Sequence, residues 1–219
     1  MNDSIEIKYF SDVLCVWAWI AERRLREIDQ EWGDRVSISH HYMDIFSDTA
    51  NKIPAQWRNR GGYEGFGEHV IKAAAPYENA IVHADVWSRV RPHTSSNAHL
   101  LLKAVQLDCG EKVAQGFAYA IRRSFFEQGQ DISQTSILLA IADECGIDRK
   151  IIETARDNGR AIASLMSDLK SVHKLSIQGS PSWVMNDGRQ ILYGNVGYRI
   201  ISANIEELFN STPAGASWC

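Results

Sequence analysis

The sequence has few cysteines, no excess of one charge and no long apolar run. Its four cysteines among 219 residues are too few and too widely spaced for the disulfide framework of a secreted protein. The 23 basic and 27 acidic side chains are well mixed and give a net charge of -4, so no basic stripe favours nucleic acid or an anionic membrane surface. We therefore expect a small thiol or a protein thiol as the partner.

The start of the chain lacks the features of a targeting segment. The stretch MNDSIEIKYF has no basic region followed by a long apolar run, and no window reaches the length of a transmembrane helix. We therefore expect a cytoplasmic protein with a real core, since 45% of its residues are hydrophobic. In a reducing compartment each cysteine needs its own explanation.

The first 46 residues predict a βαβ unit. Residues 5–10 alternate between apolar and polar side chains and then meet Ser11 and Asp12, which suit a turn and a helix cap. From Trp17 onward the apolar residues recur every three or four positions, and Gly33 is placed to end that helix. Residues 35–43 alternate again as a strand. Cys15 therefore lies at the first crossover.

The middle of the chain predicts an inserted helical domain. A polar stretch, WRNRGGYEGFG, lacks the spacing of a phosphate-binding loop and reads as a mobile loop. Helical periodicity then runs from about Asn97 to Leu175 with no strand pattern between. Ser95 or Ser96 is placed to cap the first of these helices.

The end of the chain predicts a ββα unit. SWVMN and RQILYG read as strands joined by a DG turn, and VGYRIISANIEELF reads as an amphipathic helix. The whole plan is an α/β protein, a thioredoxin fold with an inserted all-helical domain. We expect residues 1–46 and 176–219 to form the thioredoxin-like domain and residues 47–175 the helical insertion.

Cys15 is the first candidate for a catalytic residue. A thiol at the first turn of a helix faces unpaired amides and the positive end of the helix dipole, which favour the thiolate and lower its pKa. We therefore expect Cys15 to be the most thiolate-like cysteine, although Asp12 would oppose this if its carboxylate came near. The alternative is that Cys15 is a small buried apolar residue.

A second element of the site is QGSPSW, in which Pro181 precedes a strand. Proline in a tight turn before a strand is a setting for a cis peptide bond, and we expect one between Ser180 and Pro181. The backbone of Ser180 would then be free to pair with an extended thiol peptide or with glutathione. The alternative is a trans proline at the start of an edge strand.

The segments SDVLCVWAW, GSPSWVMN and YGNVGYRIISANIEELF, with the helical insertion between them, resemble the DsbA-like thioredoxin-fold family. That family includes disulfide oxidoreductases, kappa-class glutathione transferases and 2-hydroxychromene-2-carboxylate isomerases. The dithiol members have CxxC where this chain has Cys15 followed by Ala18, so Cys15 can form a mixed disulfide that no neighbouring thiol resolves. Transferase and isomerase members typically have serine at the position of Cys15 and an acidic residue after the asparagine that matches Asn195, where this chain has Val196.

The resemblance implies a substrate site around Cys15 and Pro181, and we assign further residues to it. These substrate-binding candidates are Ser11, Trp17, Ser96, Asn97, Ser180, Pro181 and Asn195. We also propose Cys219 as a second catalytic thiol, because the tail STPAGASWC could return to Cys15 and resolve its mixed disulfides in one chain or across a homodimer. The alternative for this tail is an unstructured end with an incidental cysteine.

Other polar residues carry weaker signals. Cys109 and Cys145 each precede a glycine near a helix end, and we expect both in the core. His40 and His41 are adjacent on a strand and point to opposite faces, so they cannot readily bind one metal ion, and we expect no metal site. We expect no tightly bound cofactor, with glutathione as a possible thiol partner.

Three functions remain open at this point. The first is a thiol/disulfide oxidoreductase or isomerase that uses the single cysteine of CVWA. The second is a glutathione-dependent transferase or isomerase in which Cys15 orients a bound thiol. The third is a noncatalytic thiol-binding module built on a redox fold that has lost its second thiol.

Overall fold

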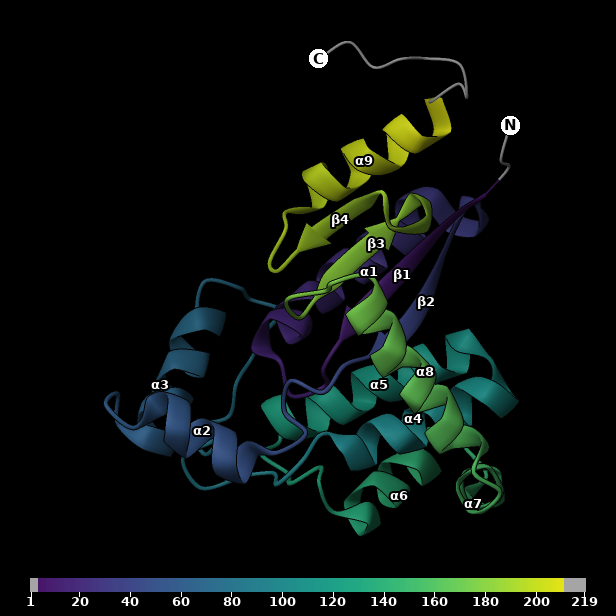
Figure 1. Ribbon diagram of the computed structural model, residues 1–219. Helices are drawn as coiled ribbons and strands as arrows, with labels where there is room; N and C mark the ends of the chain where they lie inside the picture. The colour runs from purple at the N-terminus through teal and green to yellow at the C-terminus, as the bar shows by residue number, and fades with distance from the viewer. Residues whose placement is uncertain (1–3, 211–219) are drawn as a thin grey trace.

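The computed structural model describes residues 4–210 and is built around a mixed four-stranded sheet (Figure 1). The strand order is β2-β1-β3-β4, in which β2 is parallel to β1 while β3 is antiparallel to both β1 and β4. In chain order the elements are β1 (Ile5–Ser11), α1 (Val16–Trp32), η1 (Gly33–Arg35), β2 (Val36–Tyr42), α2 (Thr49–Trp57), α3 (Gly62–Ala74), α4 (Ser96–Cys109), α5 (Glu111–Phe126), α6 (Thr135–Glu144), α7 (Arg149–Asp157), α8 (Arg160–Lys174), β3 (Ser182–Met185), η2 (Asn186–Gly188), β4 (Gln190–Tyr193) and α9 (Tyr198–Asn210).

This order confirms the fold expected from the sequence. A βαβ unit begins the chain, a ββα unit ends it, and the helices α2 to α8 lie between them. The protein is therefore an α/β protein with a thioredoxin fold and a helical insertion. The proposed boundaries, at residues 46/47 and 175/176, fall between β2 and α2 and between α8 and β3, and as domain limits they stay predictions.

The two faces of the sheet are covered by different helices. Ile7 and Tyr9 of β1 lie in one hydrophobic cluster with residues of α1 and α9, whereas Phe10, next along the strand, lies in another with Val172 of α8. Neighbouring side chains along a strand point to opposite faces of the sheet, so β1 contributes buried side chains to the hydrophobic clusters on both faces. Each such fully buried side chain stabilises the fold by roughly 1.5–3 kcal/mol.

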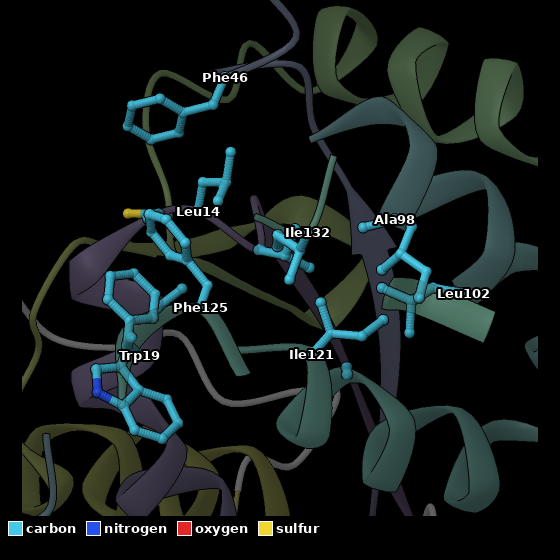
Figure 2. Close-up of a cluster of buried hydrophobic side chains, with 14 of the residues drawn as sticks. Leu14, Trp19, Phe46, Ala98, Leu102, Ile121, Phe125 and Ile132 are labelled. Atoms are coloured by element: carbon cyan, nitrogen blue, oxygen red, sulfur yellow. The ribbon is translucent and has the colours of Figure 1, made fainter. Parts of the chain in front are cut away.

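The helical insertion shares a core with the turn that carries Cys15. Leu14 and Trp19 pack in one hydrophobic cluster with Phe46, Phe125 and Ile132 (Figure 2). The ring of Trp19 stacks on Phe126 of α5 with centroids 5.7 Å apart. Contacts with the helical insertion, and not only with the sheet, therefore hold the turn that carries Cys15 in place.

Most of the glycine-rich segment is helical, which corrects the expectation of a mobile loop: residues 58–61 form a turn, and residues 62–67 belong to α3. Gly62 begins α3, and Gly67 in its second turn lies against the backbone of the 86–88 segment, where an added Cβ would be 2.8 Å from the Val86 carbonyl oxygen. Phe66 packs on Trp87 with ring centroids 5.3 Å apart. Gly67 permits this close approach, so the tertiary contact overrides its low helix propensity.

The placement of two cysteines also differs from expectation. Cys145 is exposed and Cys109 is only partly buried, so neither is the fully buried core residue expected from its helical spacing. Cys109, at the end of α4, packs against the edge of the large hydrophobic cluster, whereas Cys145 is the C-cap residue of α6. Within residues 4–210, no helix is both long and apolar enough to cross a membrane.

Candidate functional site

Cys15 is held at the junction between the end of β1 and the start of α1. It occupies the N-cap position with an extended backbone, and its carbonyl oxygen accepts hydrogen bonds from the amides of Ala18 and Trp19 at 3.1 and 3.0 Å. Its own amide donates to the Asp12 carbonyl oxygen at 3.1 Å, which closes a tight turn. Only 6% of the residue is exposed. The backbone thus fixes where the thiol points.

The second element of the site comes from the other end of the chain. The Ser180–Pro181 peptide bond is cis, the geometry expected from the sequence. The Cys15 thiol donates to the Ser180 carbonyl oxygen at 3.2 Å, and the Asp12 amide donates to the Ser180 hydroxyl at 3.0 Å. The fold therefore brings Cys15 to Ser180 and Pro181, which lie more than 160 residues later in the sequence.

Asp12 lies in the turn where the sequence placed it, but its contacts with the helical insertion were not foreseen. Its side chain is fully buried and accepts hydrogen bonds from the Leu14 amide at 2.9 Å, the Phe46 amide at 2.8 Å and the Ser95 hydroxyl at 2.8 Å. A buried carboxylate needs such partners. Ser95 is at the N-cap of α4, a position expected from the sequence, but its side chain makes no cap hydrogen bond there.

His99 ties α4 to the same turn. Its Nε2 accepts a hydrogen bond from the Val13 amide at 3.2 Å, and its ring stacks on Tyr42 with centroids 4.9 Å apart. Burial lowers the pKa of His99, in spite of the nearby Asp12 charge, and a neutral ring is what lets Nε2 act as an acceptor. For this contact the sequence offers only one signal, a histidine in the first turn of a predicted helix.

The thiol of Cys15 is less acidic than the sequence predicted. Burial raises its pKa above the ordinary value of 9.0, and the Asp12 charge acts in the same direction. Interactions with the Ser180 side chain and with the Ala18 and Trp17 amides only partly oppose this. The helix-start argument failed because it counted the amides and not the loss of water around a buried thiolate. Burial also raises the pKa values of Cys109 and Cys145, so the expectation that Cys15 is the most thiolate-like cysteine stays a prediction.

Ser11 lies in the interior and not at a surface. It is 0% exposed, and its hydroxyl accepts a hydrogen bond from Arg122 Nη2 at 2.8 Å. Arg122 is itself fully buried and pairs through Nη1 with Glu22 of α1 at 2.6 Å. This burial corrects the assignment of Ser11 to substrate binding, because its hydroxyl is already hydrogen-bonded to Arg122 inside the protein.

The remaining candidates belong to three different parts of the chain: α1, the start of α4 and the loop between β4 and α9. Trp17 is half-buried in the first turn of α1 and packs on the large cluster. Ser96 begins α4, and the Asn97 amide group donates to the Ser133 carbonyl oxygen at 2.7 Å. The Asn195 amide group donates to the Tyr77 hydroxyl, while its Oδ1 is buried without a partner. Cys219 lies outside the described residues.

The two adjacent histidines face opposite sides of β2. His40 Nδ1 contacts Glu111 Oε1 at 2.9 Å, and His41 Nδ1 contacts Asp168 Oδ1 at 2.8 Å. Each ring is therefore bound to a different helix of the insertion, α5 or α8. Among residues 4–210 there is no group of three or more metal-ligating side chains that could hold an ion.

Known proteins resemble this chain over nearly its whole length. The curated protein named ClpXP adapter protein SpxH from Halalkalibacterium halodurans is 24% identical over 220 residues, which cover 95% of this chain and 69% of that protein. The cytosolic disulfide reductase DsbM from Pseudomonas aeruginosa, solved with GSH, superposes with a TM-score of 0.68 at 17% identity and covers 92% of this chain and 99% of its own. BdbD from Bacillus subtilis gives a TM-score of 0.63 at 14% identity, with 96% and 90% covered.

At such low identities the superpositions show the fold alone. A family model described as DSBA-like thioredoxin domain matches residues 6–206, which include the strand before Cys15, the helical insertion and the cis-proline strand. The match spans far more than half of the chain. The protein therefore belongs to the DSBA-like thioredoxin domain family.

Proposed function

We propose that this protein is a thiol/disulfide oxidoreductase or isomerase that acts through mixed disulfides at Cys15. The observation that carries the proposal is the contact of the Cys15 thiol with the Ser180 carbonyl oxygen, 3.2 Å away beside cis Pro181. This contact sets the thiol against backbone that an extended substrate could pair with. Thiol exchange needs both a nucleophilic sulfur and a docked disulfide.

The chemistry proceeds in two exchanges. Cys15 loses its proton, and its thiolate attacks a disulfide R–S–S–R′ to form Cys15–S–S–R while R′–S⁻ leaves and takes up a proton. When the Cys15 proton is gone, the Ser180 carbonyl oxygen loses its donor and can accept a backbone N–H from the substrate. A second thiol then attacks the mixed disulfide and releases Cys15. Because Ala18 stands where a second thiol would be, this resolving thiol must come from elsewhere.

Glutathione is the small resolving thiol that we propose, and Cys219 is the alternative within the chain. Support for glutathione comes from the lack of a thiol at Ala18 and from the similarity in fold to DsbM, whose structure was solved with GSH. A glutathione transferase or isomerase has less support, because the Asn195 amide group is already bound to Tyr77.

A noncatalytic partner-binding module is the second candidate function. One observation favours it: burial and the Asp12 charge hold the pKa of Cys15 above its ordinary value, so the resting thiol is a weak nucleophile. The SpxH relatives are named as adapter proteins, which would fit a protein partner. In such a protein, Cys15 would be part of a docking surface and would undergo no exchange.

Intact-mass analysis after incubation with oxidised glutathione distinguishes the two functions. We expect wild type to gain one glutathione, Cys15→Ser to gain none at that site, and Cys145→Ser to behave as wild type there. Peptide mapping of the adduct should place it on Cys15. If glutathione is found only on the exposed Cys145, or if Cys15→Ser accepts it as fast as wild type, exchange at Cys15 is wrong and the adapter function gains support.

A further inference from the structure

A hollow of about 340 Å³ lies beside α1, away from the packed core, and is called the polar hollow below. It is lined by Arg23, Arg24 and Glu27 of α1, by residues 76–79 after α3 and by Tyr198 of α9. Its volume lies within the range of sites that hold small molecules or single side chains. The charged walls indicate a polar occupant.

Arg24 is held in a fixed orientation in the polar hollow. Its Nε donates to the Val196 carbonyl oxygen at 2.8 Å, and its Nη1 donates to the Ile20 carbonyl oxygen at 2.9 Å. The guanidinium carbon lies 5.7 Å from the centre of the Tyr77 ring. In the part of the chain that the structure describes, no carboxylate forms an ion pair with Arg24. A guanidinium fixed by neutral acceptors can bind an anion with little further loss of side-chain freedom.

The other charged groups of the polar hollow leave Arg24 as the group that selects its occupant. Arg23 Nε is paired with Glu27 Oε1 at 2.9 Å, so these two charges neutralise each other. Glu78 is exposed, and its charge is therefore screened by solvent. An anion in the polar hollow would meet the positive charge of Arg24 against a weaker repulsion from Glu78.

The β4–α9 loop connects the polar hollow to the candidate site. The Gly194 amide donates to the Pro181 carbonyl oxygen at 2.8 Å, and Val196, two residues later, is the residue that holds Arg24. Arg24 lies nine residues after Cys15, which is about 13 Å along α1 at 1.5 Å per residue. An extended peptide covers that distance with about four residues. A substrate that is joined to Cys15 and runs past Pro181 can therefore place a carboxylate in the polar hollow.

We propose that Arg24 binds a carboxylate of the substrate in the polar hollow. A planar guanidinium suits the two oxygens of a carboxylate. That the carboxylate belongs to a substrate of Cys15 rests on the proposed function. Two sources share this chemistry, a small thiol that carries a carboxylate and an acidic side chain of a protein substrate. In the second case the acidic residue lies about four positions from the substrate cysteine.

NMR titration of the full-length, isotope-labelled chain with two probes tests the site. The first probe is S-methylglutathione, and the second is the capped peptide Ac-Ser-Ala-Ala-Ala-Glu-NH2, in which serine replaces the substrate cysteine. We expect at least one probe to bind, and Arg24→Gln to weaken that binding roughly tenfold, because a charge-assisted hydrogen bond is lost. The probe that responds to Arg24→Gln identifies the source of the carboxylate. The same peptide with glutamine in place of glutamate should not distinguish Arg24→Gln from wild type.

Two further variants guard against an effect of Arg24→Gln on folding. Glu78→Gln removes an exposed negative charge from the polar hollow and should tighten binding of the same probe roughly twofold. Arg26→Gln is the matched control, because Arg26 is also on α1 but lies outside the polar hollow, over the ring of Tyr119 at 5.5 Å, and should bind the probe as wild type does.

Equal binding by wild type, Arg24→Gln and Glu78→Gln would overturn the proposal, as would the failure of both probes to bind wild type. Neither probe carries a thiol or a disulfide, so the titration does not depend on exchange at Cys15. The carboxylate site and the proposed function can therefore fail separately.

Discussion

The Cys15 thiol donates its hydrogen to the carbonyl oxygen of Ser180, 165 positions later in the chain, at a distance of 3.2 Å. Burial raises the pKa of the same thiol, and the charge of Asp12 adds to this effect. The site thus combines a position suited to exchange with a thiol that is protonated at rest. Removing the thiol proton is therefore the step that a partner or the pH has to assist.

The pH profile of Cys15 alkylation should reflect this raised pKa. In wild type we expect slow reaction with iodoacetamide at pH 7 and a rate that continues to rise above pH 9.0, the ordinary pKa of a cysteine. Asp12→Asn removes the nearby negative charge, so the pKa should fall and alkylation at pH 7 should become faster. The control is Asp187→Asn, because that side chain is almost fully exposed. Equal rates for Asp12→Asn and wild type would contradict the electrostatic role of Asp12.

A second thiol at Ala18 should convert the site to a dithiol. Residues 15 and 18 are one helical turn apart, within the separation of about 4.4–6.8 Å between Cα atoms that a disulfide needs. We expect Ala18→Cys to form an intramolecular disulfide on mild oxidation, at a cost in stability of about 1–3 kcal/mol, because Ala18 is 0% exposed in a packed core. Peptide mapping without reduction checks the bond. Ala21→Cys, also buried but six residues from Cys15, should form no such bond.

Stability should fall in acid through Asp168. Burial alone would raise the pKa of this carboxyl, but the hydrogen bond to His41 and the charge of Lys103, 3.0 Å away, lower it below the ordinary 3.8. Since the folded-state pKa is depressed, the stabilisation is fully present above pH 3.8 and is lost as the pH falls through the folded value. Asp168→Asn should cost about 3–5 kcal/mol near neutral pH, because Lys103 is left buried without its partner.

Urea unfolding at several pH values tests this role. The difference in free energy of unfolding between wild type and Asp168→Asn should be largest near neutral pH and should shrink in acid. Asp143→Asn is a useful control, because Asp143 binds Arg149 on the surface and belongs to an exposed pair worth little. A difference that does not change with pH would show that packing, and not charge, explains the effect of Asp168→Asn.

Two helical glycines should respond to alanine in opposite ways. Gly67→Ala would place a Cβ 2.8 Å from the Val86 carbonyl oxygen, so we expect a loss of about 1–3 kcal/mol as α3 is pushed from the segment it packs on. Gly116→Ala in α5 meets nothing within 4 Å and should stabilise the protein by about 0.4–1 kcal/mol. Chemical denaturation of both variants checks the contrast, and equal effects would mean that helix propensity alone decides at Gly67.

The sequence by itself determined the βαβ unit at the start, the ββα unit at the end and the two ends of the site. Alternating residues predicted β1 and β2, periodic apolar residues with Gly33 predicted α1, and the small residues before Pro181 predicted the cis bond. These features depend on local backbone preferences and on one buried face per element, both of which are written in short stretches of sequence. For that reason the family resemblance carried by SDVLCVWAW, GSPSWVMN and YGNVGYRIISANIEELF led to the right fold.

Only the tertiary structure decided how buried and how acidic Cys15 is. The Asp12 side chain, the Arg122–Glu22 pair and the helical state of the glycine-rich α3 all depend on partners tens of residues away. The desolvation of a side chain and its pairing with buried charges depend on every element that packs around it. A short stretch of sequence therefore does not predict them. The sequence could therefore identify the thiol, whereas the packing of the helical insertion against the turn determined how deeply it is buried and in which direction its pKa is shifted.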